Sequence, residues 1–171
     1  MSPLLERASA VRLAIFDVDG VLTDGTLWIG PQGEMFKPFN IHDGHGIKML
    51  QREGIDTAIL SGRSSEAVTR RAGELAIRRV VQGAEDKLAA FGKLAAEAGV
   101  GPEACAFVGD DLPDLAVMRA CGFAVAVANA VEEVKAVSHY VTLAPGGHGA
   151  VREFCELVIR ARGQLAAPRA V

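Results

Sequence analysis

Two aspartates at the end of an apolar run are the first residues of this chain that could do chemistry. The run over residues 11–16 stops abruptly at Asp17-Val18-Asp19-Gly20. Carboxylates two positions apart repel each other and resist burial unless a cation holds them. Mg²⁺ suits such a pair because it is a hard ion that prefers oxygen ligands. The stretch therefore indicates a magnesium site, and a solvated turn rich in Asp and Gly is the alternative.

Polar side chains also follow two later apolar runs, and a lysine accompanies them. Ser61 ends one run, and Asp110 and Asp111 end another. In an open parallel sheet, ligands bind just outside the carboxyl ends of the strands, so these side chains are expected to meet at one edge. Lys87 stands at the head of a predicted helix, where the helix dipole disfavours a cation. That placement suggests an anion that requires the lysine, whereas a solvated surface lysine is the plainer interpretation.

Predicted strands and helices alternate along the chain, which favours an α/β fold with a mainly parallel sheet. The expected strands cover residues 12–16, 55–60, 77–81, 105–108, 123–128 and 139–143, and the expected helices cover residues 3–8, 44–53, 64–76, 85–98, 112–120, 131–137 and 150–162. Asp43 is the expected cap of the second helix. No gap leaves room for a second domain of about 50 residues, so we expect one domain over residues 1–171 with a tail at about 164–171.

Residues 26–38 predict a β-hairpin. The segments Thr26-Leu27-Trp28-Ile29 and Glu34-Met35-Phe36-Lys37 flank the turn residues Gly30-Pro31-Gln32-Gly33. An isolated hairpin is only marginally stable in water. So much apolar surface on one hairpin indicates a subunit interface rather than a solvent-facing flap, and packing against its own domain is the alternative.

Composition and charge argue against several classes of protein. The 171 residues are 50% hydrophobic and 23% charged, as in ordinary globular chains, and the net charge of −3 provides no basic field for nucleic acid. No apolar run approaches the ~20 residues of a membrane span, and residues 1–10 lack an apolar signal core, so a cytoplasmic location is expected. The widely spaced Cys105, Cys121 and Cys155 favour buried reduced thiols over a metal site.

In order and type, these motifs resemble those of the haloacid dehalogenase-like phosphatases. The four matching segments are Asp17-Val18-Asp19-Gly20, Leu60-Ser61-Gly62-Arg63, Lys87 and Gly109-Asp110-Asp111-Leu112-Pro113-Asp114. Flanking segments at residues 18–25, 39–47 and 146–153 are similar to the narrower 3-deoxy-D-manno-octulosonate 8-phosphate phosphatase family, so the resemblance covers nearly the whole chain. Two positions depart from that pattern, because an arginine is expected where His42 and His148 stand.

The resemblance implies a capless, Rossmann-like three-layer domain that assembles as a homotetramer around the hairpin. The implied activity is Mg²⁺-dependent hydrolysis of 3-deoxy-D-manno-octulosonate 8-phosphate to the free sugar acid and phosphate, in lipopolysaccharide (KDO) biosynthesis. The implied partner is thus a small sugar phosphate, with no nucleic acid and no membrane. The chemistry agrees with the residues, because a dianionic phosphomonoester needs cations beside an attacking carboxylate.

The same resemblance assigns roles to the acidic residues and the lysine. It implies that Asp17 attacks phosphorus and forms an aspartyl-phosphate. Asp19 would protonate the leaving sugar oxygen and then activate water. The implied metal ligands are Asp17, the Asp19 carbonyl oxygen and Asp110. Asp114 is expected to orient Lys87 or to support the metal ligands.

Other residues are implied to bind the substrate. The phosphate would be held by Ser61, Lys87 and backbone N–H groups near Gly20 and Gly62. Arg63 and Arg71 are the candidates for the substrate carboxylate, since arginine suits bidentate recognition of that group. Arg71 is also a candidate for the site of a neighbouring subunit.

Three other functions stay open. One is a phosphatase for a nine-carbon 2-keto sugar acid 9-phosphate, although a glutamate is expected in that group where Arg63 stands. Another is a non-catalytic haloacid dehalogenase-like oligomerisation domain, and the complete set of acidic residues and lysine argues against it. A phospho-accepting signalling receiver also gathers acidic residues, a Ser or Thr and a lysine around Mg²⁺. In a receiver, however, the phosphorylated aspartate follows a middle strand, whereas the candidate nucleophile here follows the first strand.

Overall fold

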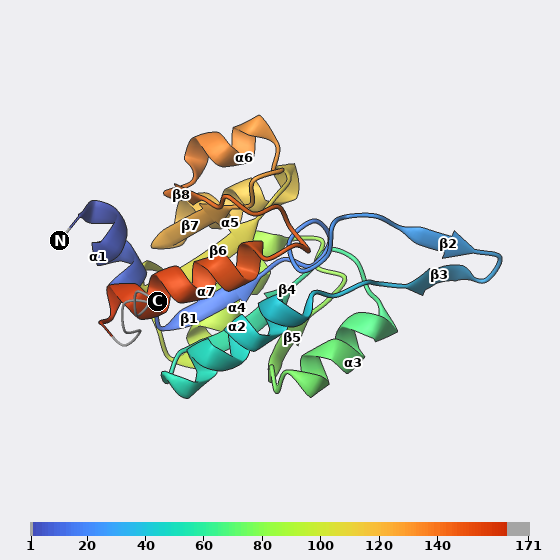
Figure 1. Cartoon of the computed structure of the whole chain (residues 1–171), viewed down its shortest axis with the longest axis horizontal. Coiled ribbons are helices and arrows are strands. Elements are labelled where there is room, and N and C mark those ends of the chain that lie inside the picture. Colours follow the sequence, from blue (N-terminus) through green and yellow to red (C-terminus); the bar gives the residue numbers. More distant parts are fainter. Residues whose placement is uncertain (1, 164–171) are drawn as a thin grey trace, which may run out of the picture.

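A six-stranded parallel β-sheet forms the centre of the protein (Figure 1). The computed structural model describes residues 2–163, so the expected tail at about 164–171 lies outside the described residues. The strands are β1 (Leu13–Phe16), β4 (Asp56–Leu60), β5 (Arg79–Val81), β6 (Cys105–Gly109), β7 (Phe123–Ala126) and β8 (Tyr140–Val141). Their order is β5-β4-β1-β6-β7-β8, and every neighbouring pair is parallel. The predicted α/β class with a parallel sheet is confirmed.

Helices cover both faces of this sheet and give the fold three layers. They are α1 (Pro3–Ser9), α2 (Ile41–Arg52), α3 (Glu66–Glu74), α4 (Lys87–Ala98), α5 (Leu115–Ala120), α6 (Glu132–Val137) and α7 (Ala150–Ala161). Helices α1, α2 and α7 pack together on one face, and α4, α5 and α6 pack on the other (Figure 1). Two short 3-10 helices, η1 (Pro102–Ala104) and η2 (Leu112–Asp114), precede β6 and α5. None of the described helices is long and apolar enough to span a membrane.

The central strand β1 lies between β4 and β6, and all four of its side chains are buried. Continuous apolar runs of this kind are expected in parallel strands that are covered on both faces. Phe16 packs edge-on against Phe154 of α7, with ring centroids 5.8 Å apart. The register places Phe16 beside Ile59 of β4 and Val108 of β6. The carboxyl ends of three neighbouring strands therefore meet at one edge of the sheet, as the sequence predicted.

The segment after β1 leaves the body of the protein as a β-hairpin (Figure 1). Strands β2 (Trp28–Gly30) and β3 (Gly33–Phe36) pair antiparallel in a separate two-stranded sheet. Trp28 stacks on Phe36 with ring centroids 5.2 Å apart, and each residue remains 49% exposed. The predicted protruding hairpin is confirmed. Apart from it, residues 2–163 form no insertion large enough to cap the carboxyl edge of the sheet.

The N-terminal cap of α2 differs from the prediction. The helix starts one residue after Asn40, which caps it by accepting hydrogen bonds from the N–H groups of His42 and Asp43. Asp43, the expected cap, is buried, and its carboxylate accepts from the N–H groups of Arg152 (2.8 Å) and Gly149 (3.4 Å). Asn and Asp are comparable helix caps. The fold decided between them, because only Asp43 faces the first turn of α7.

Candidate active site

Three carboxylates and one lysine meet at the carboxyl edge of the sheet. Asp17 follows β1, Asp110 follows β6 and Asp114 ends η2, and one oxygen from each lies within 4.8 Å of the others. The Lys87 ammonium lies between two of them, with Nζ 2.9 Å from Asp17 Oδ2 and 2.7 Å from Asp114 Oδ1. Asp17, Lys87 and Asp114 are buried, so these ion pairs are largely removed from water. We call these four residues the acidic cluster.

Secondary structure determines where Asp17 and Lys87 enter the acidic cluster. The Asp17 N–H donates to the Val108 carbonyl at 3.1 Å, which continues the ladder between β1 and β6 past the strand end. Lys87 is the first residue of α4, and the Asp86 side chain caps this helix by accepting from the Ala89 N–H at 2.9 Å. A carboxylate at the cap offsets the unfavourable dipole that a lysine meets there. The cap therefore helps Lys87 to hold this position.

One ammonium does not neutralise the acidic cluster. Burial raises the pKa of Asp110 to about 8, and the carboxylates of Asp17, Asp114 and Asp111 add to the shift. Burial and the Asp114 carboxylate raise the pKa of Asp17 to about 6, against the opposing effect of Lys87. Burial alone would lower the pKa of Lys87, but the two neighbouring carboxylates raise it, so the lysine is charged. The side chains alone thus leave excess negative charge.

The oxygens without hydrogen bonds identify atoms that could bind a cation. Asp114 is fully engaged, because Oδ1 accepts from Lys87 and Oδ2 accepts from the Asp110 N–H at 2.9 Å. Asp110 Oδ1 is buried and has no hydrogen-bond partner among the described residues. The Asp19 carbonyl oxygen also accepts no hydrogen bond from residues 2–163. An unpartnered buried carboxylate is costly, so Asp17 and Asp110 fit a hard divalent cation, and the metal-binding role of the Asp19 carbonyl stays a prediction.

Gly20 allows the loop after β1 to approach Asp110 closely. A Cβ atom at this position would lie 2.0 Å from Asp110 Oδ2, and the residue has φ +86°, so both space and backbone require glycine. Thr23 Oγ1 closes the loop by accepting from the N–H groups of Gly20 (3.3 Å) and Gly25 (3.2 Å) and donating to the Val18 carbonyl (3.3 Å). The Gly20 N–H thus donates within the loop here, and its predicted contact with phosphate stays a prediction.

Ser61 and Gly62 lie on the lysine side of the site. Ser61 directly follows β4 and is buried, and its Oγ accepts from the Arg63 N–H at 3.3 Å. Gly62 lies beside the lysine, since a Cβ atom there would be 3.9 Å from Lys87 Cε. A hydroxyl and a backbone N–H next to an ammonium suit the oxygens of an anion. The predicted phosphate-binding role of both residues is compatible with this geometry.

The two arginines predicted to bind substrate lie in different surroundings. Arg63 is about half exposed, and its Nε lies 3.6 Å from Asp19 Oδ2. Arg71 lies on α3, pairs with Glu74 at 3.0 Å and forms no ion pair with the acidic cluster within the described part of the chain. Within one chain, Arg63 thus lies beside Asp19, whereas Arg71 lines a cavity with Glu34 and Lys37. The role of Arg71 at a neighbouring subunit's site stays a prediction.

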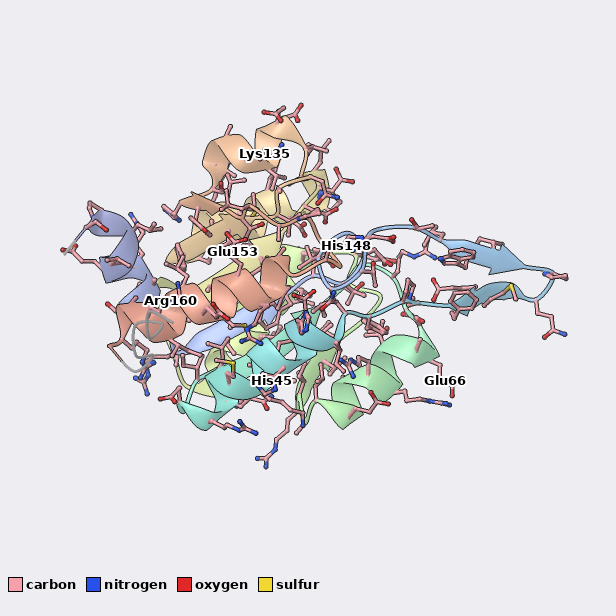
Figure 2. The ribbon with its side chains drawn as sticks, in the orientation of Figure 1. His45, Glu66, Lys135, His148, Glu153 and Arg160 are labelled. Carbon is pink, nitrogen blue, oxygen red and sulfur yellow. The ribbon has the colours of Figure 1, made fainter. Side chains whose placement is uncertain are left out.

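The two histidines that stand in place of expected arginines flank the buried Asp43. His42 is exposed in the first turn of α2, and His148 is exposed in the loop before α7, near the base of the hairpin in Figure 2. Burial raises the pKa of Asp43, and both histidines act in the opposite direction. The Gly147 N–H donates to the Val21 carbonyl at 2.9 Å, so this loop packs directly on the loop after β1.

Sequence reasoning missed one charged group at this edge. Lys37, at the base of the hairpin, is buried, and its Nζ lies 2.5 Å from Asp19 Oδ1 and 2.8 Å from Glu34 Oε2. The sequence carries one signal for it, because Lys37 is the only basic residue of the predicted hairpin. Lysines are mostly exposed, so this signal is weak until the fold shows the burial.

A cavity of about 600 Å³ lies at the opposite edge of the sheet, by the amino ends of β4 and β5. Two of its lining residues, Asp56 and Arg79, pair with each other at 3.1 Å. Because that pair is already neutralised, the acidic cluster is the stronger candidate for chemistry.

Several phosphatases of one family are similar to this chain. Residues 77–153 match the haloacid dehalogenase-like hydrolase family. The 3-deoxy-D-manno-octulosonate 8-phosphate phosphatase KdsC of Yersinia pestis is 45% identical over 162 residues, 95% of this chain and 87% of that protein. The 3-deoxy-D-manno-octulosonate 8-phosphate phosphatase of Moraxella catarrhalis is 44% identical to this chain, with a TM-score of 0.92 over 95% of this chain and 94% of that one. Its structure was solved in complex with a magnesium ion, a phosphate ion and a KDO molecule. The cobalt-bound Haemophilus influenzae deoxy-D-mannose-octulosonate 8-phosphate phosphatase is 41% identical with TM-score 0.90, over 92% of each chain.

Proposed function

The chain belongs to the haloacid dehalogenase-like hydrolases, in the family of the 3-deoxy-D-manno-octulosonate 8-phosphate phosphatases, and from this premise we propose that it hydrolyses 3-deoxy-D-manno-octulosonate 8-phosphate to the free sugar acid and phosphate. The observation that carries the proposal is the buried pair of Asp17 and Lys87 beside the unpartnered oxygen of Asp110. A carboxylate nucleophile, an ammonium and a position for a cation are what a dianionic phosphomonoester requires.

The proposed reaction has two steps that use the same two aspartates. First, a carboxylate oxygen of Asp17 attacks phosphorus, and the bond from phosphorus to the bridging sugar oxygen breaks. The electron pair stays on that oxygen, which takes a proton from the Asp19 carboxyl. Next, water attacks phosphorus and gives a proton to the Asp19 carboxylate, while the bond to Asp17 breaks and its electron pair returns to the Asp17 carboxylate. Both side chains end as they began.

Lys87 and Asp114 would support the charge that this reaction creates. Lys87 offsets the repulsion between Asp17 and the phosphoryl oxygens, and Asp114 holds the lysine in place through its 2.7 Å contact. Mg²⁺ is the proposed cofactor, bound by Asp17, Asp110 and the Asp19 carbonyl oxygen, where it would neutralise phosphoryl charge. The unpartnered Asp110 oxygen and the magnesium ion in the Moraxella catarrhalis relative support this proposal.

The proposed substrate contacts divide between the phosphate and the sugar acid. Ser61 and the N–H groups of Gly62 and Gly20 would bind phosphate oxygens. Arg63 would bind the sugar acid, because a half-exposed guanidinium beside Asp19 is placed to meet a carboxylate. Arg71 is the second candidate for this carboxylate, in its own site or in that of a neighbouring subunit.

We also propose that the hairpin assembles the protein as a homotetramer. Ile29 is 63% exposed and Met35 is 66% exposed, and the remaining large apolar side chains of the hairpin, Leu27, Trp28 and Phe36, are 42–49% exposed. Soluble monomers rarely present so much contiguous apolar surface. Light scattering should give a tetramer for the wild type and a smaller species for Ile29→Ser combined with Met35→Ser. A monomeric wild type would overturn the assembly.

Release of phosphate by the purified protein tests the activity. With Mg²⁺ present, the eight-carbon sugar phosphate should turn over faster than the nine-carbon 2-keto acid 9-phosphate, and chelation of the metal should abolish turnover. Asp17→Asn should lower the rate roughly 10³-fold or more, because it removes the nucleophile. Asp56→Asn, an exposed carboxylate at the opposite edge of the sheet, is the matched control and should retain full activity.

The outcomes separate the parts of the proposal. Retained phosphate release by a folded Asp17→Asn variant would remove Asp17 from the nucleophile role. Faster turnover of the nine-carbon compound would reassign the substrate and leave the reaction type unchanged.

A further inference from the structure

Lys37 is buried, although the large apolar side chains of the hairpin are exposed. Lys37 directly follows β3 and is 8% exposed, whereas Met35, two residues earlier in β3, is 66% exposed. Lysine is almost never fully buried unless it is paired. Burying the ammonium while an apolar neighbour stays in solvent is the reverse of what hydration alone would favour. Specific contacts must therefore hold Lys37.

One of these contacts reaches the proposed acid and base of the reaction. Lys37 Nζ donates to Asp19 Oδ1 at 2.5 Å. Asp19 Oδ2 accepts no hydrogen bond from the described residues, and Arg63 Nε, at 3.6 Å, lies beyond hydrogen-bond distance. Lys37 thus occupies one oxygen of the carboxyl and leaves the other free. A carboxyl held in this way keeps a single orientation.

Glu34 holds Lys37 from the other side. Glu34 Oε2 lies 2.8 Å from Lys37 Nζ and 3.3 Å from the Arg63 guanidinium, while Oε1 accepts from Ser65 Oγ at 2.7 Å. Burial alone would raise the pKa of Glu34, but Lys37, Ser65 and Arg63 lower it, so the carboxylate is ionised. The Ser65 N–H in turn donates to Gln82 Oε1 at 2.8 Å. The ammonium is therefore tied to the loops after β4 and β5 as well as to the hairpin.

We propose that Lys37 is a positioning residue for the Asp19 carboxyl. The inference rests on the proposed phosphatase activity and adds a residue to it. In the first step, the sugar oxygen that keeps the electron pair of the broken P–O bond must receive the proton of Asp19. Proton transfer requires alignment within hydrogen-bond reach, which a freely rotating carboxyl satisfies only part of the time. Lys37 holds Oδ1, which leaves Oδ2 as the oxygen available to transfer the proton.

The dependence of kcat/KM on the leaving group tests this role. With an irreversible first step, kcat/KM reports the reaction up to the aspartyl-phosphate, where Asp19 acts as the acid. A sugar alkoxide needs that proton, whereas the nitrophenolate of p-nitrophenyl phosphate leaves without it. Lys37→Met should lower kcat/KM for the sugar phosphate by about 10- to 100-fold, a part of the 10²–10⁴ that a positioned acid supplies. The value for p-nitrophenyl phosphate should change less than about threefold.

Two further variants and one control complete the test. Lys37→Arg keeps a cationic donor and should restore most of the activity on the sugar phosphate. Glu34→Gln weakens the support of Lys37 and should lower kcat/KM for the sugar phosphate, but not for p-nitrophenyl phosphate, by less than Lys37→Met does. If Lys37→Met does not fold, the Glu34→Gln variant tests the positioning role instead. Lys93 lies on the exposed side of α4, and Lys93→Met should leave kcat/KM unchanged for both substrates.

The possible results point to different conclusions. Equal losses on the two substrates, or no loss on either, would overturn the positioning role and leave the proposed function intact. A wild-type protein that releases phosphate from neither substrate would overturn the proposed function, and this inference with it.

Discussion

Removing the charge of Asp110 is predicted to stabilise the metal-free protein while abolishing its Mg²⁺-dependent activity. Asp110 Oδ1 is buried without a hydrogen-bond partner among the described residues. Burial, followed by the carboxylates of Asp17 and Asp114, raises the pKa of Asp110 to about 8. Asp110→Asn keeps the shape of the side chain and removes the negative charge whose burial is unfavourable. The same charge is what a bound cation would need.

The sign of the effect follows from proton binding. Between the usual carboxyl pKa of 3.8 and about 8, the folded protein keeps a proton on Asp110 that the unfolded chain releases. Stability therefore falls as the pH rises through this range and stays low above it. At about 1.4 kcal/mol per pH unit, a rise from pH ~5.5 to ~8 can lower the stability by at most roughly 3.5 kcal/mol. Relaxation of the loop reduces this to about 1–3 kcal/mol, against a domain stability of about 5–15 kcal/mol.

Urea denaturation in EDTA at these two pH values measures the effect. The wild type should lose about 1–3 kcal/mol between them, and Asp110→Asn should lose correspondingly less and be the more stable protein at the higher pH. Comparing the two slopes removes the contribution of the four histidines, which both proteins share. Asp56→Asn should behave as the wild type. Added Mg²⁺ should stabilise the wild type at the higher pH, but not Asp110→Asn.

Two results would refute this reasoning. Asp110→Asn with the same pH slope as the wild type, or with lower stability at the higher pH in EDTA, would show that the buried carboxylate is not under strain. Equal stabilisation of both proteins by Mg²⁺ would remove Asp110 from the metal ligands.

Two other substitutions test the packing that shapes the site. Gly20→Ala should lower kcat at least about tenfold, because the new Cβ would meet Asp110 Oδ2 at 2.0 Å and the backbone φ of +86° adds about 1–2 kcal/mol of strain. Steady-state phosphate release measures this effect, and wild-type kinetics would contradict it. Asp43→Asn should destabilise the protein by about 1–3 kcal/mol. The carboxylate uses two oxygens to accept from the N–H groups of Gly149 and Arg152, whereas an amide has only one acceptor oxygen. Urea denaturation measures this effect, and unchanged stability would exclude Asp43 as the anchor of α7.

Elements whose structure depends on neighbouring residues were predictable from the sequence, whereas contacts between residues far apart in the sequence were not. The strand before Asp17, and the position of Asp17 at the carboxyl edge of the sheet, were predictable, because an apolar run that ends in carboxylates is a local signal. The cap of α2 was not, since Asn40 and Asp43 are both good caps and the packing of α7 selected between them. Arg71 was predicted to bind substrate from its residue type, and that role stays a prediction, because within one chain its ion pair is with Glu74.

The amino-acid sequence by itself determined which chemistry this protein could do: alternating apolar runs specify a parallel sheet, and the residues after each run place Asp17, Ser61 and Asp110 on adjacent strand ends. Tertiary structure alone decided which further charged group meets them there. Lys37, which no sequence motif identified, reaches Asp19 across 18 positions. Burial and hydrogen bonding depend on such distant partners, because a side chain's desolvation is set by everything packed around it rather than by its neighbours in sequence.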